Sequence, residues 1–266
     1  MRLDLFGRPA LLFLPASRAS AISRARTSGA DVVILDLEDA VRPEDKETAR
    51  SAAVAAAGED WLMPVGIRVN LLGSGGALPE DVAAVAESRA DFIVLPKADG
   101  GIGELARASG KPVVAMVETP AGVLALREMV RDSGIAGLIA GTNDLAAELG
   151  LPVGAGREPL QMALQSIVLA ARAGGMPAWD GVFNRLDDAV GLEAEARSGR
   201  TLGFDGKSLI HPDQIAPCKA AFAPSPEEIA RAERLVAAAR GGAQRFEEQM
   251  IEAMHVEAAR RVLDRR

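Results

Sequence analysis

The sequence has few of the residues on which several classes of protein depend. It contains one cysteine, Cys218, so no disulfide can form within the chain, and we expect a cytoplasmic protein. It contains no tyrosine, and aromatic residues make up 3% of the chain, which argues against a surface that stacks nucleic-acid bases. The two histidines, His211 and His255, are too few for a histidine-based metal site.

Long apolar runs and an excess of basic charge are also missing. The longest early apolar run, Leu11–Leu14, is too short for a signal-peptide core or a membrane span. The net charge of -7 argues against binding to nucleic acid or to an anionic membrane surface, so we expect a soluble chain with neither partner. With 266 residues, 48% of them hydrophobic, the chain can bury the core of one large domain or two small ones.

What the sequence does contain is a regular alternation of short apolar runs and helical patterns. The runs are rich in Val, Ile and Leu, which is typical of strands buried in a parallel sheet. We expect eight such strands, at residues 10–14, 32–35, 65–70, 92–95, 112–117, 137–140, 177–180 and 202–206. Eight strand–helix units in roughly 220 residues favour an α/β protein with a (β/α)8 TIM barrel. A doubly wound open sheet shows the same alternation and is the alternative.

The chain after Phe222 departs from this alternation. Residues 225–228, Ser-Pro-Glu-Glu, have the pattern of a capping box and predict the start of a helix. A last helix is expected at residues 253–265. We therefore divide the chain into a catalytic barrel domain, residues 1–223, and a helical extension, residues 224–266, which packs on the barrel or on a neighbouring subunit.

Two acidic residues follow neighbouring strands at the expected site-forming edge. Glu118 comes directly after the fifth strand, and Asp144 follows the sixth at the start of a short helix. Because the carboxyl ends of parallel strands meet at one edge, we expect these carboxylates to converge. A pair of carboxylates leaves room for the waters and substrate oxygens that Mg²⁺ prefers, so they predict a Mg²⁺ site. The alternative is that Asp144 caps its helix and Glu118 pairs with an arginine.

Other strand ends carry charged or polar side chains as well. Arg68 alternates with Ile67 and Val69, so it points away from both, and its planar fork could clamp a carboxylate or carbonyl at the barrel mouth. The alternative is a structural ion pair between Arg68 and the acidic segment Asp36–Asp39. The remaining candidates at strand ends are Asp36, Glu38, Asp39, Asn70, Lys97, Asp180, Asp205 and Lys207.

A set of short segments, in a fixed order along the chain, is similar to a known family. The segments are Leu11–Pro15, Val33–Asp39, Lys46 with Arg50, Arg68–Asn70, Leu95–Lys97, Val117–Thr119, Gly141–Leu145 and Gly206–Pro212. Together they resemble the citrate lyase β-subunit-like branch of the HpcH/HpaI aldolase family over nearly the whole chain. The resemblance implies a phosphoenolpyruvate/pyruvate-type barrel in a homotrimer or hexamer. It also implies a Mg²⁺-dependent carbon–carbon lyase that cleaves or forms a short 3-hydroxyacyl-CoA, such as citryl-, citramalyl- or malyl-CoA, with a keto acid and acetyl-CoA as products.

The resemblance also implies roles for single residues. Glu118 and Asp144 match the family's metal ligands, and Arg68 and Glu118 match its substrate contacts. Arg68 would stabilise the oxyanion, while Glu38 and Asp39 would hold metal-bound waters. In addition, Asp36 belongs to that outer layer and Asp39 is a candidate for proton transfer. The basic residues that CoA phosphates require are expected at Arg18 and Arg24.

Three positions depart from the family pattern. Ala16 stands where glycine is common, and Asn143 stands where an acidic residue is frequent. Glu252 replaces an aspartate of a tail segment that in relatives reaches an active site, often that of a neighbouring subunit, which makes it a third catalytic candidate. Two other functions remain open: a CoA-free class II aldolase that releases pyruvate from a hydroxy-keto acid, and a β subunit that acts only in a complex with an acyl carrier protein.

Overall fold

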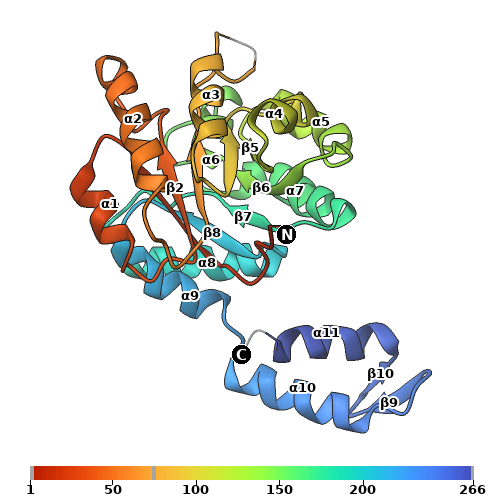
Figure 1. Ribbon diagram of the computed structural model, residues 1–266. Coiled ribbons are helices and arrows are strands. Elements are labelled where there is room, and N and C mark those ends of the chain that lie inside the picture. The colour runs from red at the N-terminus through yellow and green to blue at the C-terminus, as the bar shows by residue number, and fades with distance from the viewer. Residues whose placement is uncertain (1–2, 74–75, 265–266) are drawn as a thin grey trace. The chain divides into compact units, whose positions relative to one another are not determined.

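The computed structural model describes residues 3–73 and 76–264 (Figure 1). Eight parallel strands form a closed barrel in which each strand pairs with the next and β8 pairs with β1. The strands are β1 (Ala10–Pro15), β2 (Val32–Asp36), β3 (Val65–Arg68), β4 (Phe92–Leu95), β5 (Val113–Val117), β6 (Ile135–Ala140), β7 (Ala178–Asp180) and β8 (Gly206–Leu209). The predicted (β/α)8 barrel is therefore confirmed, and the open sheet is wrong.

Helices cover the outside of the barrel and follow the strands (Figure 1). They are α1 (Ala19–Ala25), α2 (Lys46–Ala57), α3 (Pro79–Glu87), α4 (Ile102–Ser109), α5 (Pro120–Met129), α6 (Thr142–Glu148), α7 (Gln161–Gly174), α8 (Ala189–Leu202) and α9 (Ile215–Phe222). The start of α5 shows how the sequence sets such a boundary. The Thr119 hydroxyl accepts a hydrogen bond from the Gly122 N–H at 2.9 Å, and Pro120 takes the first helical position.

The inside of the barrel is filled by apolar side chains from alternate strand positions. Phe92, Ile139 and Trp179 are fully buried in this core. Gly66 makes room for one of these side chains, because a Cβ at that position would collide with the Phe92 ring. The Trp179 Nε1–H donates to the backbone carbonyl of Arg8 at 2.8 Å, so its one polar group is satisfied. Close packing of this kind holds the strand ends in fixed positions.

One strand lies elsewhere than the sequence predicted. We expected the eighth strand at residues 202–206, but α8 continues to Leu202 and β8 covers Gly206–Leu209. Gly203 ends α8 in the left-handed region, with φ of 101°, as is common at helix ends. The prediction was wrong because the polar pair Lys207-Ser208 interrupts the apolar pattern of the true strand.

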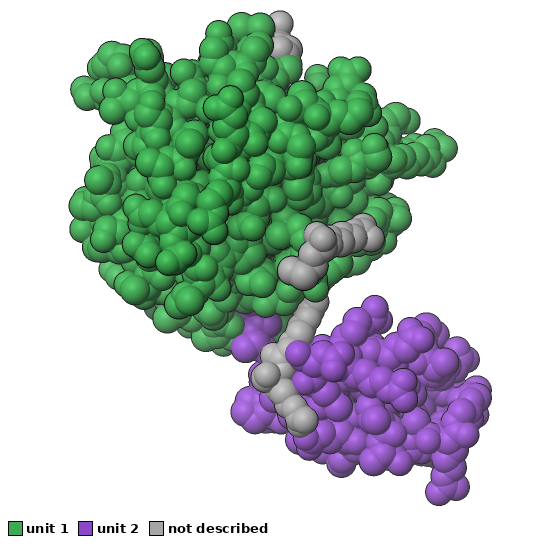
Figure 2. Space-filling view, in the orientation of Figure 1, with its two compact units in different colours: residues 1–221 green, residues 222–266 purple. Residues whose placement is uncertain are grey.

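The chain divides into two compact units, Met1–Ala221 and Phe222–Arg266, which Figure 2 shows in different colours. The second unit contains α10 (Pro226–Ala238), an antiparallel hairpin of β9 (Gln244–Phe246) and β10 (Gln249–Ile251), and α11 (Ala253–Leu263). The predicted capping box at residues 225–228 is present. A small core of Ala232, Leu235, Ile251 and Ala259 joins the helices and the hairpin.

The sequence analysis missed the hairpin of the second unit, since its strands are three residues each and too short for an alternating pattern. The last helix was expected to reach Arg265. It ends at Leu263, and Arg265 lies outside the described residues. In the parts of the chain that the structure describes, no helix combines the length and the apolar character needed to cross a membrane.

Candidate functional site

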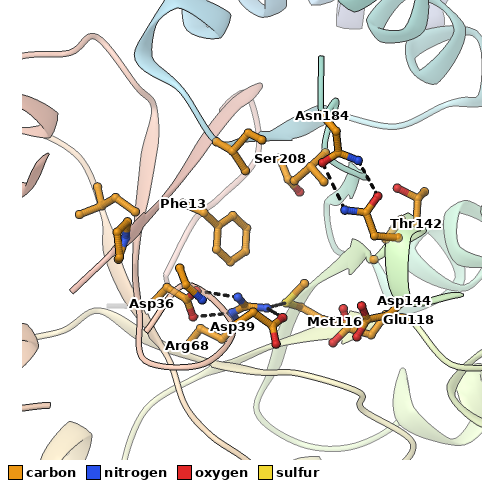
Figure 3. A pocket seen from close by; sticks show the side chains of 18 residues that line it. Phe13, Asp36, Asp39, Arg68, Met116, Glu118, Thr142, Asp144, Asn184 and Ser208 are labelled. Carbon is orange, nitrogen blue, oxygen red and sulfur yellow. Dashed lines mark hydrogen bonds and ion pairs between the residues drawn. The ribbon is translucent and has the colours of Figure 1, made fainter. Parts of the chain in front are cut away.

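A pocket of about 340 Å³ opens at the carboxyl ends of the barrel strands (Figure 3). Its volume is in the range of sites that bind small molecules. The charged residues that line it are Asp36, Asp39, Arg68, Glu118 and Asp144. These are five of the residues for which the sequence predicted a role, so the structure brings them together around one cavity.

A larger hollow, of about 640 Å³, lies at the opposite end of the strands. It is lined by the segment Leu3–Phe6 and by the amino-terminal ends of β5, β6 and β7. Asp4 is the one titratable residue among its described lining residues. Because five charged side chains converge on the smaller pocket and one lines the larger hollow, the smaller pocket is the candidate site.

Arg68 organises the β2–β3 side of the pocket (Figure 3). The parallel register places Arg68 opposite Asp36, and its Nε and Nη2 donate to the two Asp36 carboxylate oxygens at 2.6 Å each. Its Nη1 lies 2.7 Å from Glu38 Oε2 and 3.2 Å from Asp39 Oδ2. Burial lowers the pKa of Arg68, but the three carboxylates, Asp36 above all, outweigh that effect. The pKa is raised above its usual range, so the guanidinium stays charged.

The acidic segment after β2 is folded back over Arg68 by its own backbone. The Asp36 carboxylate accepts hydrogen bonds from the Glu38 N–H at 2.9 Å and the Ala40 N–H at 3.1 Å. Lys46 on α2 donates to the carbonyl oxygens of Leu37 and Glu38 at 2.7 and 2.6 Å. This lysine therefore fixes the loop that carries Glu38, which gives a structural reason for its place in the sequence pattern.

Sequence analysis missed Asp81, which supports the same loop indirectly by holding Asn70, whose Oδ1 accepts a hydrogen bond from Lys46 at 2.7 Å. Asp81 is fully buried, and its carboxylate accepts the N–H and the side-chain amide of Asn70 at 2.8 and 2.7 Å. Its other oxygen lies 2.6 Å from Arg50 Nε. Asp81 lies in the first turn of α3, where acidic residues are ordinary, so its sequence position carried no signal.

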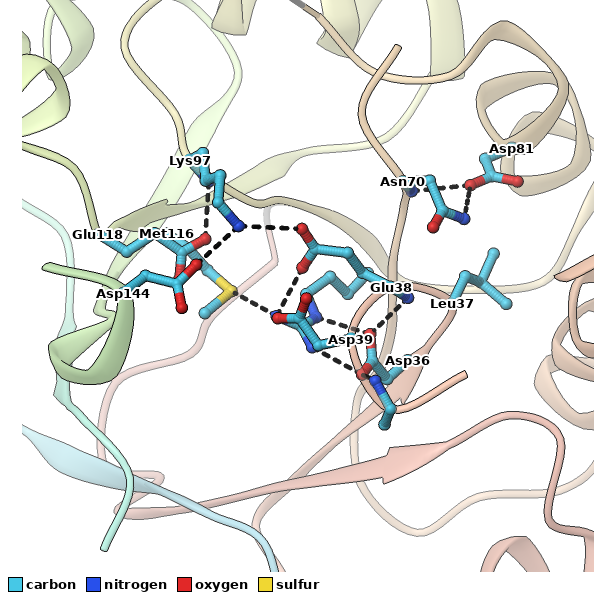
Figure 4. A network of polar contacts seen from close by, with 12 residues as sticks. Asp36, Leu37, Glu38, Asp39, Asn70, Asp81, Lys97, Met116, Glu118 and Asp144 are labelled. Carbon is cyan, nitrogen blue, oxygen red and sulfur yellow. Dashed lines mark hydrogen bonds and ion pairs between the residues drawn. The ribbon is translucent and has the colours of Figure 1, made fainter. Parts of the chain in front are cut away.

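Glu118 and Asp144 lie side by side on the opposite side of the pocket (Figure 4). Glu118 follows β5 and is 3% exposed, while Asp144 lies in the first turn of α6. Gly141 is required here, because a Cβ at that position would collide with the Glu118 carboxylate. The pKa of Glu118 is raised above its usual range. Burial is the main cause and Asp144 adds to it, while Arg68 and Lys97 oppose the shift.

Lys97 lies between the two sides of the pocket (Figure 4). Its backbone N–H donates to Glu118 Oε1 at 2.8 Å. Its ammonium Nζ lies 2.7 Å from Asp144 Oδ2 and 3.4 Å from Glu38 Oε1. Burial raises the pKa of Glu38 to about 7, although Arg68 and Lys97 oppose that shift. The sequence placed Lys97 at a strand end and gave it no role.

These side chains form what we call the mouth cluster: Asp36, Glu38, Asp39, Arg68, Lys97, Glu118 and Asp144. Within residues 3–73 and 76–264, no group of three or more His, Cys, Asp or Glu side chains is placed to hold a metal ion. Two carboxylates are nevertheless enough for Mg²⁺, which takes its other ligands from water and substrate. Glu118 and Asp144 are the pair that could hold it.

Uncharged residues complete the pocket, and sequence analysis did not name most of them. The Phe13 ring lies 5.3 Å from the Arg68 guanidinium carbon, and Met116 Sδ lies 3.9 Å from Arg68 Nη1. The side-chain amides of Asn143 and Asn184 pair reciprocally at 2.8 and 3.3 Å (Figure 3). Phe13 and Met116 could have been predicted from the sequence, because the alternation along β1 and β5 turns both side chains inward.

Two further predicted residues belong to a different cluster, which faces the helices outside the barrel. The Asp180 side chain points toward α8, since a Cβ on Gly199 would come within 2.6 Å of Asp180 Oδ2. Arg157 donates to both Asp180 carboxylate oxygens at 2.8 and 2.6 Å. Lys207 Nζ lies 3.2 Å from Asp180 and 2.7 Å from Glu195, with no side-chain exposure. We call Arg157, Asp180, Glu195 and Lys207 the outer network.

Asp205 was predicted at the carboxyl end of the eighth strand, and this position is wrong. Asp205 precedes β8, so it lies at the amino-terminal end of the strand, away from the pocket. Its Oδ2 accepts the Ala178 N–H and an Arg172 N–H, each at 2.9 Å. It therefore links the start of β7 to α7.

Glu252, the third catalytic candidate, belongs to the second unit. It precedes α11, is exposed, and its N–H donates to His255 Nδ1 at 3.0 Å. The pocket is lined by residues of the first unit. A catalytic role of Glu252 stays a prediction.

Comparisons of the sequence with known proteins point to a single family. A sequence model of the HpcH/HpaI aldolase/citrate lyase family matches residues 9–212. A (3S)-malyl-CoA thioesterase of Cereibacter sphaeroides is 36% identical over 266 residues, which cover 95% of this chain and 92% of the relative. A citrate lyase subunit beta-like protein of Mycobacterium tuberculosis is 35% identical over 254 residues, or 92% and 90% of the two chains.

Solved structures are similar over comparable lengths. The crystal structure of CitE from Mycobacterium tuberculosis, in complex with magnesium, acetoacetate and coenzyme A, superposes with a TM-score of 0.86. It is 35% identical and covers 99% of both chains. The citrate lyase beta subunit from M. tuberculosis, complexed with oxaloacetate and magnesium, has a TM-score of 0.72, 34% identity, and covers 82% and 97% of the two chains.

Proposed function

The chain belongs to the HpcH/HpaI aldolase/citrate lyase family, and we propose that it is a Mg²⁺-dependent lyase of a short 3-hydroxyacyl-CoA. The substrate is of the citryl-, citramalyl- or malyl-CoA type, and cleavage gives a keto acid and acetyl-CoA. The observation that carries this proposal is the mouth cluster, in which Glu118 and Asp144 face the fixed guanidinium of Arg68 across a pocket of about 340 Å³.

The donor set of the pocket suits a magnesium ion. Glu118 and Asp144 would hold it, with Glu38 and Asp39 placed to hydrogen-bond waters around it and Asp36 behind them. When bound, Mg²⁺ would polarise the substrate oxygen that becomes a ketone and would orient the substrate carboxylate next to it. Related proteins support this assignment, because the CitE structure that covers 99% of this chain is a complex with magnesium and coenzyme A.

Cleavage requires a base and a donor for the negative charge that develops. The substrate hydroxyl loses its proton, the carbon–carbon bond breaks, and its electron pair passes to the acetyl-CoA carbon, which is then protonated. We assign the role of base to Asp39, which accepts the proton of the substrate hydroxyl. Its side chain lines the pocket and is 62% exposed. Arg68 stabilises the oxyanion with its positive charge, and Asp36 fixes the plane of the guanidinium through Nε and Nη2. Glu252 is the proposed donor of the second proton.

The second candidate function is hydrolysis of the thioester. It is favoured by the name of the C. sphaeroides relatives, (3S)-malyl-CoA thioesterase, at 36% identity over 95% of this chain. Hydrolysis needs a water near the thioester carbonyl in place of a proton transfer to carbon. The two functions therefore differ in product and use the same pocket.

Three further proposals follow from the family. The protein acts as a cytoplasmic homo-oligomer, a trimer or hexamer, and residues 224–266 pack on the barrel or on a neighbouring subunit. The phosphates of CoA bind near Arg18 and Arg24, which are exposed on α1 and at its start. A CoA-free aldolase that releases pyruvate, and a β subunit that depends on an acyl carrier protein, are the alternatives.

One experiment separates these readings of the pocket. The purified full chain is incubated with Mg²⁺ and, in turn, with citryl-, citramalyl- and malyl-CoA and with free 4-hydroxy-2-keto acids. Keto acid with acetyl-CoA identifies the lyase, and free CoA thiol with an intact hydroxy acid identifies the thioesterase. Pyruvate from the free acids alone identifies the aldolase. No turnover of any CoA ester by the isolated oligomer contradicts the leading proposal.

A further inference from the structure

Lys97 has an unusual backbone conformation at the centre of the mouth cluster. Its φ is 45°, in the left-handed region that non-glycine residues seldom adopt outside turns and functional sites. The residue follows β4 by two positions, and this conformation turns its N–H toward β5 while its side chain reaches toward α6 (Figure 4). One residue thereby contacts both proposed metal ligands.

The two contacts of Lys97 have opposite consequences for a metal. The backbone N–H bond to Glu118 Oε1, at 2.8 Å, orients that carboxylate and remains compatible with a bound cation. The ammonium at 2.7 Å from Asp144 Oδ2 is different, because it fills the space on the carboxylate that a cation would take. Mg²⁺ binds its oxygen ligands at about 2.0–2.1 Å, so both cations cannot share that oxygen without strong repulsion.

The structure also offers the ammonium an alternative partner. Glu38 Oε1 lies 3.4 Å from Lys97 Nζ, while Glu38 Oε2 pairs with Arg68. A lysine side chain has a flexible stem of four carbons, and the side chain of Lys97 is 31% exposed. A short movement of Nζ from Asp144 to Glu38 therefore needs no change in the backbone.

We propose that Lys97 is an internal counter-cation of the metal site: its ammonium neutralises Asp144 in the metal-free protein and moves toward Glu38 when a divalent cation binds. Lys97 is thus a positioning residue that lowers the affinity of the site for free Mg²⁺, while its N–H keeps Glu118 in place. This inference rests on the proposed Mg²⁺ site at Glu118 and Asp144.

Direct metal binding to the full chain tests the proposal without any turnover. Mn²⁺ is titrated and followed by electron paramagnetic resonance, and Mg²⁺ by calorimetry. Lys97→Met removes the charge and keeps both the N–H and the length of the side chain. We expect it to tighten Mn²⁺ binding by about fivefold or more, the worth of one partly exposed ion pair. Lys97→Arg, which keeps the charge, should stay within about twofold of wild type.

A lysine outside the cluster provides the control. Lys111 donates to the Ser88 carbonyl at 3.1 Å and pairs with no carboxylate of the mouth cluster, so Lys111→Met should leave metal binding unchanged. If Lys97→Met does not fold, Lys97→Gly replaces it, because glycine favours a φ of 45° and also removes the ammonium. The same gain in affinity is expected.

The outcomes distinguish this inference from the site on which it rests. Unchanged or weaker Mn²⁺ binding by folded Lys97→Met or Lys97→Gly overturns the counter-cation role. If wild type binds Mn²⁺ but Glu118→Gln and Asp144→Asn bind it equally well, the proposed site itself is wrong. Tighter binding in the lysine variants together with lost binding in the carboxylate variants supports both.

Discussion

The mouth cluster and the outer network are two groups of charged side chains that differ in their balance of charge. In the mouth cluster, five carboxylates share the two basic side chains Arg68 and Lys97. In the outer network, Asp180 and Glu195 meet Arg157 and Lys207, one cation for each anion. In a balanced, buried group each charge depends on its partners, so the loss of one partner destabilises the fold. An excess of negative charge at a cavity instead leaves a place for a cation.

The direction of the side chains explains why strand-end charge alone could not tell these groups apart. Trp179 points into the barrel core and its neighbour Asp180 points out toward α8. In the same way Ser208 lines the pocket while Lys207 is buried on the outside. Alternation along a strand therefore decides whether a charge belongs to the site or to the scaffold.

The largest expected effect comes from breaking the outer network. Lys207→Met leaves Asp180 and Glu195 with Arg157 alone, in a position without solvent exposure. Removing one partner of a buried ion pair costs about 3–5 kcal/mol, and we expect that loss in the free energy of unfolding from urea titration. Lys219→Met is the control, since its pair with Asp31 is half exposed and is worth less than about 1 kcal/mol. Equal costs in the two variants would contradict the comparison.

The mouth cluster should respond in the opposite sense. Glu118→Gln or Asp144→Asn removes one of two carboxylates that could hold Mg²⁺, and we expect turnover to fall by about 1000-fold, equivalent to roughly 4 kcal/mol. The free energy of unfolding should stay the same or rise, because each change reduces repulsion among five carboxylates. Steady-state kinetics with Mg²⁺, beside urea titration, checks both parts. Full turnover in either variant would mean that the metal lies elsewhere.

Arg68 joins the features of both groups, because it is buried and paired like the outer network yet lines the pocket. Arg68→Lys keeps the charge and loses the planar fork that Asp36 holds at two points. We expect turnover to fall by about 100-fold, close to 3 kcal/mol, with a smaller loss of stability. A lysine enzyme with normal kcat and reduced stability would show that Arg68 is structural, the alternative that the sequence left open.

Local sequence patterns were sufficient for the parts of the fold and the site that depend on local order. Apolar runs located seven strands, and the rule of carboxyl strand ends placed Arg68, Glu118 and Asp144 around one pocket. The family resemblance drawn from eight short segments is confirmed by the family match over residues 9–212.

Parts that depend on distant partners could not be predicted. The true eighth strand carries Lys207, which is tolerated there because Glu195 and Asp180, far away in sequence, neutralise it. Asp81 looked like an ordinary helix-start residue until Asn70 and Arg50 were seen to surround it. Pairing across such separations follows from tertiary structure and leaves no periodic signal.

The burial of Glu38 within the mouth cluster also predicts a dependence of stability on pH. Burial raises the pKa of Glu38 from 4.5 to about 7, so the folded state favours the protonated acid. This contribution is fully present below pH 4.5 and is lost as the pH rises through 7. Compared with Glu38→Gln, wild type should therefore lose on the order of 2 kcal/mol between pH 4.5 and 8. The measurement is the free energy of unfolding from urea titration at a series of pH values. Glu193→Gln, which removes an exposed ion pair with Arg197, is the control and should change this pH profile little.

The smallest expected effect asks whether the mouth cluster is complete without the second unit. Glu252 is exposed at the start of α11, so Glu252→Ala should change the free energy of unfolding by less than about 0.5 kcal/mol. If its carboxylate protonates the acetyl-CoA carbon, kcat should fall, and we expect about tenfold, since general acids are worth 100-fold or more only when well placed and glutamate is longer than the family's aspartate. Glu252→Asp provides the sharper test, because shortening the side chain restores the residue of that pattern and should raise kcat. If Glu252→Ala and Glu252→Asp both keep wild-type kcat and oligomeric state, the second proton must come from Asp39, and the mouth cluster alone carries the chemistry.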